Sequence, residues 1–334
     1  MSDKKFLYIA LGIVVIVFIF AGFSFVQKKF EKNTAQDIGF FEICKYGSPD
    51  EIKLALNNGA DLYMTDEEDK TPLMLAVSNN ENIEATKILI EAGADVNAKN
   101  KYGTTALMCT KKPKVIGTLI QAGADVNAQN VYGETALMLC NDSAEAIKAL
   151  ISAGADLNIK TREGSTALNL AVADYSQNPK FELLENIKTL LMAGAEVNIR
   201  ERDGSTALMI ASKYSSDPVL INILIGSGAY INSRDNEGHT AVMLAACYNQ
   251  NPEVTYALAK SGAKDLADKS GRTALMYAVY ADNPEIVRTL IKYKFNINAR
   301  DKNGVSVLGI TNGSCSSKHK LEIMTILLNA GAEE

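Results

Sequence analysis

The sequence is poor in the residues on which most enzyme active sites depend. Its 334 residues include only two His, His239 and His319, and no Trp. None of the five Cys has the spacing of a zinc site, and five thiols cannot all pair within one chain; they are Cys44, Cys109, Cys140, Cys247 and Cys315. The sequence contains no Ser/His/Asp grouping, phosphate-binding loop or paired carboxylates in a burying context. We therefore expect no enzyme activity, cofactor, metal or disulfide framework, and interpret the thiols as small buried side chains.

Clusters of basic residues are missing as well. The formal net charge is −5 at pH 7; residues 1–37 carry +2, which leaves −7 on the remainder of the chain. Binding to nucleic acid needs clustered Lys and Arg that neutralise phosphates. No nucleic-acid partner is expected.

Apolar residues are concentrated in one block near the N-terminus. Residues 6–26, FLYIALGIVVIVFIFAGFSFV, carry no charge, and 15 of these 21 residues are Leu, Ile, Val or Phe. A helix of this length, rising ~1.5 Å per residue, spans a hydrocarbon core of ~30 Å. The sequence therefore predicts an N-terminal tail at 1–5, a transmembrane helix in the lipid bilayer at 6–26 and a juxtamembrane linker at 27–37.

A cleaved signal peptide is the alternative interpretation of this block. Such a peptide has a shorter apolar region of ~7–15 residues that ends in small side chains. Here the run is longer, and the bulky Phe20, Phe23 and Phe25 lie at its end, which favours an uncleaved anchor. Two lysines precede the span and three follow it closely, so the positive-inside rule gives nearly equal weight to the two orientations. Because a single N-terminal anchor often leaves the N-terminus inside, we expect the rest of the chain on the extracytoplasmic side.

Self-similarity organises everything after this block. The phrase Gly-Ala-Asp or a close variant recurs every 30 to 40 residues, starting at Gly59, Gly93, Gly123, Gly154, Gly194, Gly228, Gly262 and Gly331. Lys294-Phe-Asn-Ile-Asn fills the same slot before the last copy. A second phrase, Thr-Ala-Leu-Met or a variant, keeps pace with it, starting at Thr71, Thr105, Thr135, Thr166, Thr206, Thr240 and Thr273.

The local chemistry of each repeat predicts two helices. A Gly before the Thr suits a turn that needs positive φ, and the Thr then caps a short helix rich in Ala and Leu. Pairs such as Ser48-Pro49 and Asp217-Pro218 place a capping residue before a Pro at the first helical position, so a second helix begins there. That helix ends at the Gly of the next Gly-Ala-Asp.

A helix–turn–helix unit with a period near 33 resembles the ankyrin repeat. The family's Gly-Ala-Asp-Val-Asn phrase occurs here, and its T-P-L-H-x-A phrase occurs with Met in place of His. The resemblance implies an all-α ankyrin-repeat solenoid of about nine repeats over residues 38–334, preceded by the transmembrane helix. The expected repeats are 38–66, 67–100, 101–130, 131–161, 162–201, 202–235, 236–268, 269–301 and 302–334.

The chain departs from the family pattern in two respects. Met replaces the usual His, which in the family makes a local hydrogen bond, and we expect it only to fill space in the core; the positions are Met74, Met108, Met138, Met209, Met243 and Met276. Repeats three and four are also short by about one helical turn, and repeat five is long.

The resemblance implies an exposed concave face of finger-like turns and first helices that binds proteins. Tyr is a common interface anchor, and six recur on this face, which makes them candidate partner-binding residues: Tyr102, Tyr132, Tyr175, Tyr214, Tyr248 and Tyr280. Tyr214 and Tyr248 lie eight residues after their repeat's Thr, Tyr175 nine and Tyr280 seven. Packing between repeats is the alternative role for these rings. A second recurring set offers mixed charge with neighbouring acids and is interpreted as a solvated surface; it comprises Lys99, Lys160, Arg200, Arg234 and Arg300.

The function predicted from the sequence is that of a membrane-tethered scaffold or adaptor for protein–protein interaction. The alternative is a dedicated stabilising, maturation or immunity partner of one specific enzyme. Both would use the same face, and the fold does not name the partner.

Overall fold

The structure is a computed structural model that describes residues 35–313 and 318–333. The predicted membrane-spanning segment, 6–26, and the tail before it lie outside the described residues. Among the residues that are described, no helix is long and apolar enough to cross a membrane. The first described helix, α2, begins at Ala35, within the range predicted as a linker.

Within the described ranges the chain is helical, and its extended pairing is limited to two isolated bridges, Ala267 with Thr273 and Arg300 with Ser306. It divides into two compact units. The first contains the described residues up to Thr110 together with Gly117–Ala124, and the second contains Lys111–Ile116 and the described residues from Asp125 onward. Helix α6, Pro113–Gln121, is shared between them.

The first unit contains two complete helix pairs and a short turn of 3₁₀-helix. Its elements are α2 (Ala35–Tyr46), α3 (Pro49–Asn57), α4 (Pro72–Asn79), α5 (Ile83–Glu91) and η1 (Ala106–Cys109). Helix α2 packs against α4, and α3 packs against α5.

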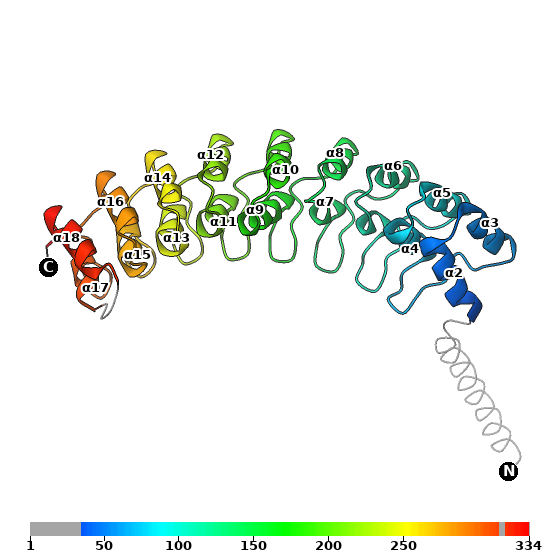
Figure 1. Cartoon of the computed structure of the whole chain (residues 1–334), viewed down its shortest axis with the longest axis horizontal. Coiled ribbons are helices and arrows are strands. Elements are labelled where there is room, and N and C mark those ends of the chain that lie inside the picture. Colours follow the sequence, from blue (N-terminus) through cyan, green and yellow to red (C-terminus); the bar gives the residue numbers. More distant parts are fainter. Residues whose placement is uncertain (1–34, 314–317, 334) are drawn as a thin grey trace, which may run out of the picture. The chain divides into compact units, whose positions relative to one another are not determined.

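The second unit repeats the same pairing (Figure 1), with one row of first helices and one row of second helices. The first helices are α7 (Ala136–Leu139), α9 (Ala167–Gln177), α11 (Ala207–Tyr214), α13 (Ala241–Tyr248), α15 (Ala274–Tyr280) and α17 (Val307–Gly313). The second helices are α8 (Ala144–Ser152), α10 (Phe181–Met192), α12 (Pro218–Gly226), α14 (Pro252–Lys260), α16 (Pro284–Lys292) and α18 (Lys320–Asn329). Buried Leu and Ala side chains such as Leu208, Ala211 and Leu224 fill the space between the rows.

The second helices begin where the capping signals predict. The Ser48 hydroxyl accepts a 3.3 Å bond from the Glu51 amide, and the Glu51 carboxylate accepts a 2.7 Å bond from the Ser48 amide. This reciprocal arrangement satisfies two amides that the helix itself leaves unpaired. At α12 the Asp217 carboxylate accepts from the Val219 amide at 2.9 Å, with Pro at the first helical position.

The first helices are capped less regularly than predicted. Thr71, Thr166 and Thr206 accept a bond from the amide three residues on. The buried hydroxyl oxygens of Thr105, Thr135 and Thr273 lack a partner in the described part of the chain. The six Met that replace His are all buried, as predicted. The expectation that they only fill space is wrong at Met243, whose sulfur accepts a 3.5 Å bond from the Thr240 amide.

Left-handed backbone positions bear out the alignment of the repeats. Gly93, which follows α5 and its C-cap residue Ala92, has φ 99°, and Lys294 has φ 63° at the corresponding position. A non-Gly residue rarely adopts this conformation. Lys294 therefore does fill the glycine slot that the phrase Lys-Phe-Asn predicts.

Consecutive repeats are joined through main-chain atoms. The Asn198 side-chain amide donates to the Gly228 carbonyl at 2.9 Å, and its oxygen accepts from the Tyr230 amide at 2.8 Å. Asn232 makes the same two bonds with Gly262 and Lys264 of the next repeat, at 3.3 and 2.7 Å. We call these bonds the asparagine joints.

The loops before the first helices, which we call the fingers, are joined in a similar way. The Arg202 amide donates to the Glu163 carbonyl at 2.7 Å, and the Lys269 amide donates to the Glu237 carbonyl at 3.0 Å. Each finger is thereby held in register with the one before it.

The short repeats have short first helices. Elements η1 and α7 contain four residues each, whereas α11 and α13 contain eight. The missing turn predicted from the sequence is therefore confirmed in both repeats.

Candidate protein-binding surface

Five of the six candidate tyrosines are exposed. They are Tyr102, Tyr132, Tyr214, Tyr248 and Tyr280. All of them lie in fingers or at the ends of first helices, and within each unit we call the surface formed by these elements the finger face. Tyr102 lies in the first unit and the other four lie in the second.

Tyr175 is the exception, and its predicted exposure is corrected. Its side chain is only 5% exposed, and its hydroxyl donates to the Asp217 carboxylate of the next repeat. Burial, reinforced by this carboxylate, raises the pKa of Tyr175 to about 12. In this structure Tyr175 packs between repeats, which is the alternative that the sequence left open.

Tyr102 and Tyr132 occupy equivalent places in their fingers. The Tyr102 amide donates to the Asn100 side chain at 2.9 Å, and the Tyr132 amide donates to Asn130 at the same distance. These bonds fix the backbone of each turn and leave both rings exposed. The Lys101 ammonium lies 5.0 Å from the centre of the Tyr102 ring, within range of a cation–π contact.

Tyr214 and Tyr248 form one local group with Lys213. The Lys213 ammonium lies 4.8 Å from the centre of each ring, although the tyrosines belong to consecutive repeats. The rings remain 57% and 56% exposed. Because the shared cation restrains both rings, they lose less conformational freedom when a partner covers them.

Tyr280 extends the same row by one repeat. The Arg272 guanidinium lies 5.5 Å from the centre of its ring, which is 47% exposed. Three successive first helices, α11, α13 and α15, thus end in an exposed tyrosine beside a cation.

A cavity of about 490 Å³ adjoins Tyr214 and Tyr248. Its floor includes Met209, Ile210 and Leu244, which are buried. The fingers form its other wall and contribute four carboxylates, those of Glu201, Asp203, Asp235 and Glu237. This acidic wall was not predicted, because its members come from two repeats and converge only when the fingers stack.

Two of the five recurring basic residues have a more local role than a surface stripe. The Arg234 guanidinium donates to the Ala267 carbonyl of the next repeat, and Arg300 donates to the Gly304 carbonyl at 3.0 Å. These two side chains stabilise fingers. Neither lines the cavity beside Tyr214 and Tyr248.

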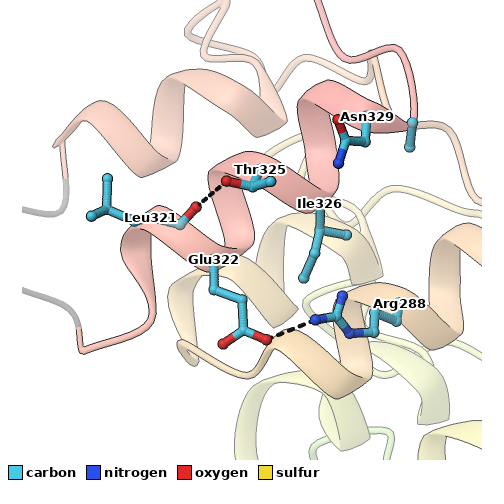
Figure 2. Close-up of a pocket in the computed structure, with 7 residues that line it drawn as sticks. Arg288, Leu321, Glu322, Thr325, Ile326 and Asn329 are labelled. Atoms are coloured by element: carbon cyan, nitrogen blue, oxygen red, sulfur yellow. Dashed lines mark hydrogen bonds and ion pairs between the residues drawn. The ribbon is translucent and has the colours of Figure 1, made fainter.

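A second hollow lies on the row of second helices, between α16 and α18 (Figure 2). Its volume is about 620 Å³. The Arg288 guanidinium and the Glu322 carboxylate pair across it at 2.7 Å, and Leu321 lies at its edge. None of the candidate tyrosines lines it.

The cysteines that the structure describes form no disulfide. Cys44 and Cys140 are buried, and burial raises their pKa values to about 12 and about 11. Cys109 and Cys247 are partly buried, and Cys315 lies outside the described residues. A high pKa keeps a thiol protonated and unreactive at neutral pH. Over residues 35–313 and 318–333, no three His, Cys, Asp or Glu side chains gather as a metal site would require.

Comparison with known proteins agrees with the repeated helix pairs. The family model described as ankyrin repeats, in three copies, matches residues 40–130, 109–201, 176–263, 208–301 and 243–333. These matches cover nearly all of the described residues. The chain belongs to the ankyrin-repeat family.

Similarity to individual relatives is confined to short segments. XBAT35 of Arabidopsis thaliana is 41% identical over 58 residues, which are 17% of this chain and 13% of that protein. Ankyrin repeat and SOCS box protein 6 of Pongo abelii is 39% identical over 61 residues, 18% of this chain and 14% of the relative. Its counterpart in Homo sapiens gives the same figures. Since so little of each relative is matched, these similarities concern the repeats alone, and the repeats imply a role in protein–protein interaction.

Proposed function

We propose that this protein is a membrane-tethered scaffold that binds a protein partner through the finger face of its second unit and catalyses no reaction. The observation that carries the proposal is the exposed pair Tyr214 and Tyr248, restrained by Lys213 beside a 490 Å³ cavity. A few residues dominate the binding free energy of many interfaces, and Tyr is one of the residue types enriched among them.

The tether is proposed from the sequence. Residues 6–26 form an uncharged run of 21 residues, and a helix of that length and composition inserts into a bilayer. We expect the full-length protein to remain in the membrane pellet after washing with high salt and alkaline carbonate. Release of the protein by carbonate, or a mature N-terminus after residue 21, would show that the segment is not an anchor.

The side of the membrane is proposed from the lysines before the span. With Lys4 and Lys5 retained inside, the repeats would face away from the cytoplasm. A reporter that is active only outside the cytoplasm, fused after the last residue, should be active. An expressed but inactive fusion would reverse the orientation.

Photo-crosslinking tests the binding surface in intact membranes. A benzophenone amino acid in place of Tyr248 should capture a defined partner that mass spectrometry identifies. The same probe in place of Met192, an exposed residue on the second-helix row, serves as the matched control and should capture much less of that partner. Equal capture at both positions would exclude the finger face as the binding site. Recovery of one enzyme in constant proportion would favour the dedicated-partner role over a general scaffold.

A further inference from the structure

The cavity beside Tyr214 and Tyr248 has two chemically different walls. The helix wall presents the two phenol rings with Lys213 between them. The finger wall presents carboxylates, and Asp203 and Glu237 are its exposed members. An occupant must therefore cover aromatic surface on one side and meet negative charge on the other.

The charges that line this cavity are unbalanced. Four carboxylates stand against one cation, Lys213, among the lining residues. The nearby Arg202 side chain does not restore the balance, since it pairs at 3.9 Å with Glu163 of the preceding finger and does not line the cavity. A negative, partly enclosed surface attracts a positively charged group and repels an acidic one.

Of the bonded carboxylates, Asp203 keeps acceptor capacity. It accepts bonds from the Ser205 amide and hydroxyl at 2.8 and 2.9 Å, its side chain is exposed, and an ionised carboxylate offers about four acceptor positions, so it can accept further donors. Asp235 is largely engaged: it accepts from the Glu237 and His239 amides, both at 2.8 Å, and lies 2.9 Å from a His239 ring nitrogen. These bonds hold both groups in place.

We propose that this cavity binds an arginine side chain from an extended basic segment of the protein partner. The proposal rests on the proposed function and specifies the chemistry of the partner. Guanidinium is planar, weakly hydrated and always charged; it pairs with carboxylates through two parallel bonds and packs well on tyrosine.

Lys213 determines where the incoming group lies. Its ammonium already occupies the position between the two rings. The partner's guanidinium therefore pairs at the finger wall, and its methylene chain covers the exposed parts of the rings. A cavity of about 490 Å³ falls within the ~300–1,000 Å³ range of ligand pockets, so residues flanking the arginine enter as well.

Peptide binding to the full-length protein in a neutral detergent tests this proposal. The probe is a fluorescein-labelled peptide, Ser-Gly-Arg-Ala-Arg-Ala-Gly-Ser, and its analogues carry Glu or Lys in place of both Arg. Binding is measured by fluorescence anisotropy at about 0.15 M salt, where long-range attraction is screened. The Arg peptide should bind more tightly than the Lys peptide, and the Glu peptide should not bind.

Two double variants locate the site. Asp203→Asn with Glu237→Gln removes two carboxylates without changing shape, and Tyr214→Ala with Tyr248→Ala removes the rings. Each should weaken binding of the Arg peptide at least about tenfold. Glu253→Gln with Glu285→Gln, on the exposed faces of α14 and α16, changes the net charge equally and should have no effect. Circular dichroism confirms that each variant is folded.

If the control Glu253→Gln with Glu285→Gln weakened binding of the Arg peptide as much as Asp203→Asn with Glu237→Gln, the attraction would be nonspecific and the proposal would be overturned. Binding of the Glu peptide as tightly as the Arg peptide, or no binding of the Arg peptide, would overturn it too. The proposed function fails separately, through crosslinking: capture of a partner at position 248 without binding of the Arg peptide would leave the scaffold role intact and reject only the arginine site.

Discussion

The Tyr277 hydroxyl donates a 2.6 Å hydrogen bond to the Asp268 carboxylate, which is buried at the base of its finger. The same hydroxyl lies 3.2 Å from the His239 ring of the preceding repeat, so it connects two repeats. Burial, followed by the bond to Asp268, raises the pKa of Tyr277 well above its usual range.

Tyr277→Phe should therefore destabilise the second unit. A lost hydrogen bond to a charged, buried group costs about 1.5–3 kcal/mol, and we expect a loss in that range in urea unfolding. Tyr230→Phe is the matched control, because Tyr230 is exposed, and its effect should be near zero. Equal stabilities for the two variants would mean that the Tyr277–Asp268 bond contributes nothing.

Comparing Gly271→Ala with Gly262→Ala distinguishes the cost of backbone strain from the cost of a steric clash. Both glycines have left-handed φ, 81° and 97°, and Ala pays about 1–2 kcal/mol in that conformation. A Cβ on Gly271 would also lie 2.7 Å from the Lys302 backbone nitrogen, whereas nothing lies within 4 Å of one on Gly262. We expect Gly271→Ala to be less stable than Gly262→Ala by about 1–3 kcal/mol. Similar melting temperatures for the two variants would show that the finger of Gly271 can move away from Lys302 without loss of stability.

Tyr175→Phe should change how stability depends on alkaline pH. The folded state raises the pKa of Tyr175 from its ordinary value near 10 to about 12. The unfolded chain thus loses this proton first, so the stabilisation is complete below pH 10 and is lost as the pH rises towards 12. At pH 7 the free energy of unfolding of the wild-type protein should exceed that of the variant by about 1–3 kcal/mol. This difference should shrink between pH 10 and 12. Parallel urea-unfolding curves across that interval would contradict the assignment.

Hydrogen exchange should be faster over residues 102–158 than over 203–298. The four-residue elements η1 and α7 lie in the first range, whereas the second range contains the eight-residue helices α11 and α13. Stability in such arrays sums over repeats and their interfaces, and even ~100 Å² of missing apolar contact is worth about 2.5 kcal/mol. Mass spectrometry of exchanged peptides measures the difference. Equal or better protection of 102–158 would show that these short repeats are not the weaker part.

The fold was accessible from the sequence because its determinants are local. Asp217-Pro218 starts a helix by its own chemistry, and Lys294 could be aligned with glycine through the residues around it. The shortness of η1 and α7 followed from counting residues between Thr and Gly. The division into two units could not be predicted, because the same phrases continue through both.

The candidate surface was only partly predictable, because one residue of offset changes which way a side chain faces. Tyr175 lies nine residues after its Thr, inside the 11-residue helix α9, and turns towards Asp217. Tyr214 lies eight residues after its Thr, is the last residue of α11 and is exposed. The acidic wall was missed for a different reason: Asp203 and Glu237 are 34 positions apart in sequence and face one cavity only after the fingers stack.

The asparagine joints hold consecutive repeats together without using the side chains that are exposed to a partner. The Asn198 side chain is hydrogen-bonded to the carbonyl of Gly228 and the amide of Tyr230. The Tyr230 ring takes no part in these bonds and remains exposed. Every amino acid has a carbonyl and all but proline have an amide. The side chain at position 230 can therefore be exchanged without breaking the joint, and the same holds for Lys264 in the next repeat. Substitutions at such positions can change which partner the surface binds without weakening the contact between repeats. Partner binding depends on the exposed side chains, whereas the asparagine joints depend on main-chain atoms.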